Sequence, residues 1–225
     1  MSATRVSPLL ELAPALGEAA QLIVLLHGVG GSSQDLLGLA HALQAQYPLA
    51  AVVLPQAPDP MDGGHPGWQW FSVQGINDAN RPARVRAARD VVLELVAAAQ
   101  TRWQVPAPAT TLGGFSQGAI LALEAATIKD GAVGRVLAFA GRYATPPAAA
   151  PAQTTIHLLH GADDAVIAAA HARDAYERLA ALGGDVTIDI AKGVGHELHP
   201  ALVATAIRRL QTCIPLRLWQ QALGG

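Results

Sequence analysis

"LGGFSQGAIL", residues 112–121, places a serine between two glycines at the boundary of two apolar segments. The run 110–115 is typical of a buried strand, and residues 117–129 have helical composition. The pattern G-x-S-x-G at such a boundary predicts a sharp turn that presents the hydroxyl of Ser116 at the carboxyl edge of a sheet. The alternative is a glycine-rich turn in which the serine only caps a helix.

Six apolar runs with little polar alternation predict strands that are covered on both faces, as in a parallel sheet. These runs are 21–27, 50–55, 110–115, 136–140, 154–160 and 186–191. The segments between them that read as helices are 34–46, 83–103, 117–129, 167–182 and 201–213. Because strands and helices alternate, the chain is expected to form a doubly wound α/β fold with a mostly parallel sheet. Its length fits a single domain over residues 1–225.

Composition excludes several classes of function. A hydrophobic fraction of 51% argues against disorder, and a formal net charge of -2 favours neither nucleic acid nor an anionic membrane surface as a partner. No apolar run approaches the roughly 18 residues of a membrane helix, and the N-terminal stretch is a poor match to a signal peptide. The lone Cys213 gives no sign of an oxidising compartment, so a cytoplasmic location is expected. The histidines show no metal-ligand spacing, so we expect no metal.

A serine hydroxyl needs a base to become a good nucleophile. In α/β-hydrolases the nucleophile is followed along the chain by an acid and then by the histidine base. Two downstream loops, 160–167 (HGADDAVI) and 193–200 (GVGHELHP), follow predicted strands and supply candidates in that order.

Each loop offers two candidates. His196 lies in a glycine-bearing loop that could reach the serine, whereas His199 precedes a proline and is expected to begin the last helix. Asp163 and Asp164 are adjacent, and these residues alone do not separate them; either could cap a helix instead. His160 ends a strand and is expected to be structural.

The oxyanion of an acyl-transfer reaction requires two N–H donors. In α/β-hydrolases one belongs to the residue after the nucleophile, here Gln117, and the other to a loop after an earlier strand. The stretch 22–35 (LIVLLHGVGGSSQD) offers such a loop, with Val29 as the donor. A dinucleotide-binding loop is the alternative, but Ser33 stands where that motif requires its last glycine.

Five motifs in chain order, from about residue 22 to residue 200, resemble the phospholipase/carboxylesterase family of serine hydrolases, which includes acyl-protein thioesterases. They are LLHGVGGSSQDL, LPQAP, GGFSQGA, HGADDAVI and GVGHELHP. The stretch WQWFSVQGI is similar to the smaller bacterial esterases of that family. The resemblance implies an α/β-hydrolase fold with a minimal lid and no cofactor.

The same resemblance implies roles for individual residues. Ser116 matches the nucleophile of the family, His196 the base and Asp164 the acid, while the oxyanion donors match Val29 and Gln117. The family usually has proline after the acid. This chain has alanine at 165, which keeps the neighbouring aspartate open as a rival.

The segment 57–82 interrupts the alternation of strands and helices and is expected to form a short lid. Its aromatic residues Trp68, Trp70 and Phe71 either bind the acyl group of a substrate or pin the segment to the domain. The C-terminal stretch IPLRLWQQALGG either docks on the domain as a terminal helix or makes a homodimer contact.

Together these features predict a serine hydrolase that cleaves small-molecule carboxylic esters, or acyl thioesters, through an acyl-enzyme intermediate. One alternative is a catalytically silent α/β-hydrolase that acts as a binding protein. A second is a dienelactone-hydrolase-like enzyme, although such enzymes typically carry a cysteine where this chain has Ser116.

Overall fold

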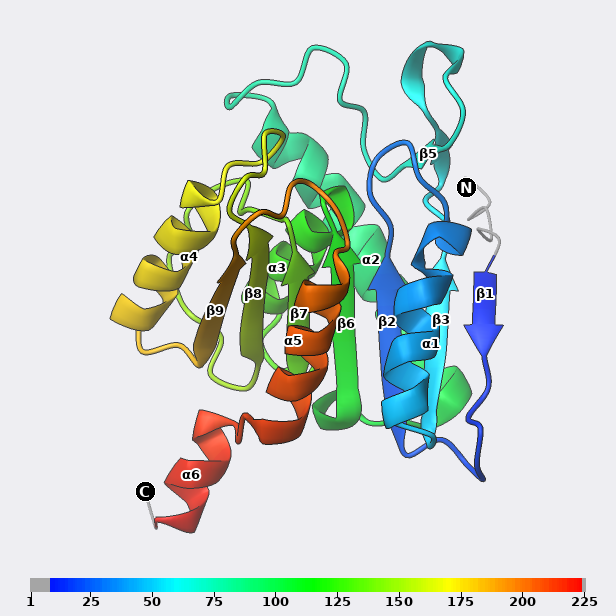
Figure 1. Cartoon of the computed structure of the whole chain (residues 1–225), viewed down its shortest axis with the longest axis vertical. Helices are drawn as coiled ribbons and strands as arrows, with labels where there is room; N and C mark the ends of the chain where they lie inside the picture. The colour runs from blue at the N-terminus through cyan, green and yellow to red at the C-terminus, as the bar shows by residue number, and fades with distance from the viewer. Residues whose placement is uncertain (1–8, 224–225) are drawn as a thin grey trace.

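The computed structural model describes residues 9–223 and is built on one seven-stranded sheet (Figure 1). Its spatial order is β1-β3-β2-β6-β7-β8-β9. The strands are β1 (Leu9–Leu12), β2 (Gln21–Leu26), β3 (Ala50–Pro55), β6 (Thr110–Phe115), β7 (Arg135–Phe139), β8 (Thr155–Gly161) and β9 (Val186–Ala191). All neighbouring pairs are parallel except β1 with β3, which confirms the expected α/β-hydrolase type of sheet.

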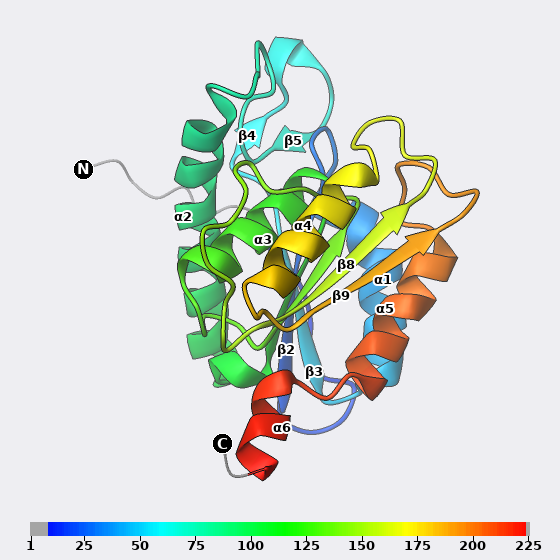
Figure 2. The same ribbon diagram turned by 90° about the vertical axis from the view of Figure 1, so that its left-hand side faces the viewer.

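Helices cover both faces of the sheet (Figure 2). One apolar core lies between the sheet and helices α2, α3 and α4, and a second lies between the sheet and helices α1 and α5. The helices are α1 (Leu37–Gln46), α2 (Arg81–Trp103), α3 (Gln117–Ile128), α4 (Ala170–Ala181), α5 (Pro200–Thr212) and α6 (Leu216–Ala222). Burial on both faces explains why the parallel strands lack polar alternation.

The sequence predictions agree closely with the regular elements. The strands predicted at 50–55, 110–115 and 186–191 have the predicted bounds, and the other three shift by one residue at one or both ends. Helix α4 begins at Ala170 rather than 167, because the side chain of Asp164 holds the preceding residues in a turn. The sequence pattern missed β1, which is short and pairs with β3 alone among the described strands, whereas α6 lies in the stretch for which a terminal helix is one of two expectations.

The segment 57–82 lies above the carboxyl edge of the sheet (Figure 1). It contains only a two-stranded ribbon of β4 (Asp59–Pro60) with β5 (Trp68–Gln69) and a short 3-10 turn, Asp62–Gly64. That this segment acts as a lid, and that residues 1–225 form a single domain, stay predictions. Among residues 9–223, no helix is long and apolar enough to span a membrane.

Candidate active site

Ser116 occupies a strained turn between β6 and α3. Its backbone has φ 53° and ψ −114°, a region that side-chain-bearing residues rarely adopt. The N–H of Ser116 donates to the carbonyl of Phe139 at 2.9 Å, which holds the turn against β7. Side chains at Gly114 and Gly118 would collide with α3 and with β2 respectively, so the flanking glycines allow the tight approach. This geometry is that of a nucleophile elbow.

Three side chains from different loops form one hydrogen-bonded chain. The hydroxyl of Ser116 lies 2.9 Å from Nε2 of His196, and Nδ1 of His196 lies 2.7 Å from Oδ2 of Asp164. The neutral imidazole therefore carries its proton on Nδ1, donates it to the carboxylate and accepts from the serine. The ring of His196 also packs against Phe115, with the ring centroids 4.9 Å apart.

Asp164, not Asp163, is the partner of His196. The side chain of Asp164 is fully buried, whereas Asp163 is exposed to solvent. Burial alone would raise the pKa of Asp164, but hydrogen bonds from His196 and from the N–H groups of Ile167 and Val166 outweigh it and lower that pKa. The carboxylate thus stays ionised beside the imidazole, as stabilisation of an imidazolium requires.

His160 also contacts the acid loop, in the structural role predicted for it. Its Nε2 donates to the carbonyl of Ile167 at 2.7 Å and lies 3.2 Å from Oδ2 of Asp164. Burial lowers the pKa of His160, which keeps the imidazole neutral. The carbonyl contact holds the loop after Asp164 in place although Ala165 stands where the family has proline. The dipeptide His-Gly at the end of β8 was the only sequence signal for this role.

Two main-chain N–H groups beside Ser116 are free to bind an anion. Within the part of the chain that the structure describes, no acceptor takes the N–H of Val29 or of Gln117. A Cβ added at Gly28 would lie 3.3 Å from Cβ of Ser116, so the loop that carries Val29 runs directly beside the serine. Main-chain N–H groups that point at a reacting carbonyl oxygen stabilise a developing oxyanion, and that role for Val29 and Gln117 stays a prediction.

His27 fixes the loop 27–31 from within. Its Nδ1 donates to the carbonyl of Gly28 at 2.8 Å, and its Nε2 accepts from the N–H of Ala57 at 3.0 Å. Burial lowers the pKa of His27, although the bond to the Gly28 carbonyl has the opposite effect. The lowered pKa favours the neutral ring, which donates through one nitrogen and accepts through the other. The sequence placed His27 at the end of a strand but did not reveal these contacts.

The aromatic residues of segment 57–82 differ in exposure. Trp70 is 3% exposed and Phe71 is 6% exposed, and both belong to the core on the α2–α3 side of the sheet. Trp68 is half-buried. Such burial favours a packing role for Trp70 and Phe71, and contact of the three aromatic residues with substrate stays a prediction.

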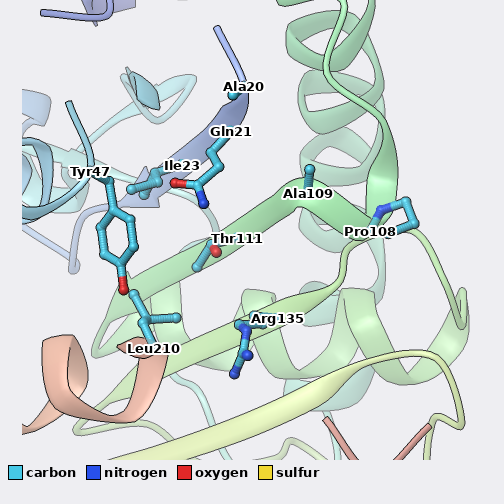
Figure 3. Close-up of a pocket in the computed structure, with 9 residues that line it drawn as sticks. All are labelled: Ala20, Gln21, Ile23, Tyr47, Pro108, Ala109, Thr111, Arg135 and Leu210. Carbon is cyan, nitrogen blue, oxygen red and sulfur yellow. The ribbon is translucent and has the colours of Figure 1, made fainter. Parts of the chain in front are cut away.

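A hollow of about 200 Å³ lies at the opposite end of the sheet from Ser116. Figure 3 shows side chains from β2, β6, β7 and α5 around it. The guanidinium of Arg135 there donates to the carbonyl of Cys213 at 2.7 Å and lies 3.1 Å from Nε2 of His157. Because α/β sheets bind ligands at the carboxyl ends of their strands and this hollow lies at the amino ends, we assign the chemistry to the edge near Ser116.

Comparison with known proteins identifies the family of this chain. The family model described as Phospholipase/Carboxylesterase matches residues 10–214. The chain belongs to the phospholipase/carboxylesterase family. It is 43% identical over 207 residues to Esterase YpfH of Escherichia coli (strain K12), a match that covers 92% of this chain and 89% of the relative. The resemblance inferred from the five sequence motifs is thereby confirmed.

Solved structures of esterases and thioesterases share the fold of this chain. Esterase PE8 superposes with a TM-score of 0.83 at 29% sequence identity, over 92% of this chain and 98% of that one. Acyl-protein thioesterase 2 of Zea mays superposes with a TM-score of 0.72 at 23% identity, over 91% of this chain and 98% of that one, and shows the fold alone. As a member of the phospholipase/carboxylesterase family, the chain is a hydrolase of the carboxylesterase and thioesterase type.

Among the residues that the structure describes, no group of three or more His, Cys, Asp and Glu side chains is arranged to hold an ion. Serine hydrolases of this type act through side-chain and main-chain groups.

Proposed function

We propose that this protein hydrolyses small-molecule carboxylic esters through Ser116, His196 and Asp164. The observation that carries the proposal is the continuous chain of hydrogen bonds from the serine hydroxyl through the imidazole to the buried carboxylate, with distances of 2.9 Å and 2.7 Å. A serine held in this way is activated by a base within reach of its proton. The family to which the chain belongs supports the same chemistry.

The proposed hydrolysis has two stages, formation of an acyl-enzyme and its hydrolysis. Oγ of Ser116 attacks the ester carbonyl carbon while its proton passes to Nε2 of His196, and the carbonyl oxygen becomes an oxyanion that the N–H groups of Val29 and Gln117 receive. The intermediate collapses as the imidazolium gives its proton to the leaving alcohol. A water then attacks the acyl-enzyme while its proton passes to His196. The bond between the acyl carbon and Oγ of Ser116 breaks as His196 returns that proton to Oγ, and the acid product leaves.

Acyl thioesters are a second proposed substrate class, since the same steps release a thiol instead of an alcohol. We also propose a cytoplasmic location, on the ground that the lone cysteine gives no sign of an oxidising compartment. We also propose that the C-terminal helix α6 makes a homodimer contact, because the apolar side chains of Leu218 and Trp219 on that helix are exposed.

A fluorophosphonate probe and an ester assay test the proposal together. The probe should label Ser116 in the wild-type chain and should not label Ser116→Ala. His196→Gln should abolish most labelling and most hydrolysis of a p-nitrophenyl ester. The matched control His199→Gln, which changes only a cap of helix α5, should keep both. A wild-type chain that binds esters but neither hydrolyses them nor takes the label would identify a silent binding protein instead.

A further inference from the structure

The side chain of Gln117, at the start of α3, forms hydrogen bonds with residues 70 and 71 of the segment 57–82. Its Oε1 accepts the N–H of Trp70 at 2.8 Å, and its Nε2 donates to the carbonyl of Phe71 at 2.7 Å. Gln117 is 3% exposed, so both bonds are shielded from water. The residue after the nucleophile therefore makes contacts through its side chain as well as offering its main-chain N–H.

The segment that Gln117 holds is bonded in turn to the loop that carries Val29. We call residues 68–71 the aromatic segment and residues 27–31 the glycine loop. The N–H of Gly30 donates to the carbonyl of Trp68 at 2.8 Å, and the N–H of Trp68 donates to the carbonyl of Gly31 at 2.9 Å. The indole Nε1 of Trp70 donates to the carbonyl of His27 at 2.9 Å.

Val29 is thus fixed from both sides by the aromatic segment. The bond from Trp70 holds the residue that begins the glycine loop, and the two bonds with Trp68 hold the residues after Val29. Gly67 packs so closely on Gly30 that an added side chain would collide with its carbonyl. One continuous set of bonds therefore connects the residues that carry the two proposed oxyanion donors, Val29 and Gln117.

We propose that the Gln117 side chain and the aromatic segment form a rigid support that sets the spacing of the two oxyanion donors. Gln117 is then a positioning residue through its side chain, separately from its N–H group. Trp70 then holds the glycine loop in position and does not contact the acyl group of the substrate. This inference rests on the proposed ester hydrolysis, because the support matters only if an oxyanion forms beside Ser116.

The variant Gln117→Met tests the proposal, because it keeps the main-chain N–H and a similar side-chain volume but removes both bonds. Kinetics on a short-chain p-nitrophenyl ester should show a fall in kcat of about 100-fold, the scale expected for a displacement of about 1 Å, with little change in KM. A trifluoromethyl ketone, whose adduct with Ser116 carries an oxyanion, should lose affinity in the same proportion. The matched control Asn80→Ala, which removes a bond to Gly75 in segment 57–82, should keep wild-type values.

A second variant covers the case in which Gln117→Met does not fold. Trp70→Phe keeps an aromatic ring in the core and both bonds of Gln117 but removes the bond to the carbonyl of His27, and it should lower kcat and trifluoromethyl ketone affinity together by about 10-fold. A fall in kcat or melting temperature with unchanged ketone affinity would overturn the inference, as would wild-type kinetics in either variant. If the wild-type chain shows no hydrolysis and no labelling, the proposed function itself fails and this inference fails with it.

Discussion

Nε2 of His160 lies 3.2 Å from Oδ2 of Asp164, the same oxygen that accepts a hydrogen bond from Nδ1 of His196. The N–H of His160 is directed to the carbonyl of Ile167 at 2.7 Å, so this second histidine holds the loop that follows Asp164. Two rings thus meet one carboxylate, and only one of them reaches Ser116.

His160→Leu should lower both stability and kcat. The change leaves the partly buried carbonyl of Ile167 without its donor, which should lower the unfolding free energy by about 1 kcal/mol. The released loop should shift Asp164 and lower kcat by roughly 10-fold with little effect on KM. Urea denaturation and ester kinetics measure the two effects.

His160→Gln is the matched control, because its amide can donate to the same carbonyl, and it should recover most of both losses. If His160→Leu keeps wild-type kcat, the histidine has no influence on the position of Asp164.

Asp164→Asn should lower kcat by about 10⁴-fold, because an amide cannot hold the imidazole in the tautomer that accepts from the serine. Asp163→Asn is the matched neighbour. Its side chain is exposed, so kcat should be essentially that of the wild type. Steady-state kinetics on one ester compare the two variants directly. If kcat falls more in Asp163→Asn than in Asp164→Asn, Asp163 is the acid and the assignment to Asp164 is wrong.

Gly118→Ala should destabilise the elbow, whereas Gly38→Ala should stabilise the protein. A Cβ at Gly118 collides with the carbonyl of Leu26, so α3 must move away from β2, at an expected cost of about 1–3 kcal/mol and with a loss of kcat. Gly38 lies in the first turn of α1 with no atom near the added carbon, and alanine there should add about 0.5–1 kcal/mol. Thermal unfolding of the two variants measures the difference, and equal shifts would contradict the packing argument.

His157 should make the protein sensitive to acid. The ring is fully buried between Thr187 and Arg135, and burial, followed by the charge of Arg135, lowers its pKa to about 3. Between that value and the ordinary pKa of about 6.5, the unfolded chain binds a proton that the folded chain excludes. The unfolding free energy should therefore decrease as pH falls below about 6.5, by up to about 1.4 kcal/mol per unit from this group.

Urea denaturation at several pH values between 5 and 7.5 tests this dependence. His157→Gln cannot titrate, so its unfolding free energy should fall less steeply with decreasing pH than that of the wild type. His41→Gln, at an exposed position, should keep the wild-type slope. Identical slopes in all three proteins would remove His157 as a cause of acid sensitivity. His27 and His160, whose pKa values are also lowered by burial, contribute in the same direction to all three.

Local sequence was enough to predict most of the sheet and the turn at Ser116. Apolar runs without alternation mark strands buried on both faces, and the spacing of glycines around a serine indicates a strand-to-helix turn, because both depend on residues a few positions apart. The same local reasoning predicted that His199 begins a helix, as it does in α5. The order of motifs along the chain then indicated the family.

The family resemblance implied Asp164 as the acid, but only the tertiary structure shows that its carboxylate contacts His196 and which residues support the proposed oxyanion donors. Asp163 and Asp164 are chemically identical neighbours, and their different exposure results from how the chain leaves β8 and packs against the loop of His196. The bonds of Gln117 join residues 46 and 47 positions apart in the sequence. Contacts over such distances depend on how strands and loops assemble in space, whereas periodicity and turn chemistry report only on near neighbours.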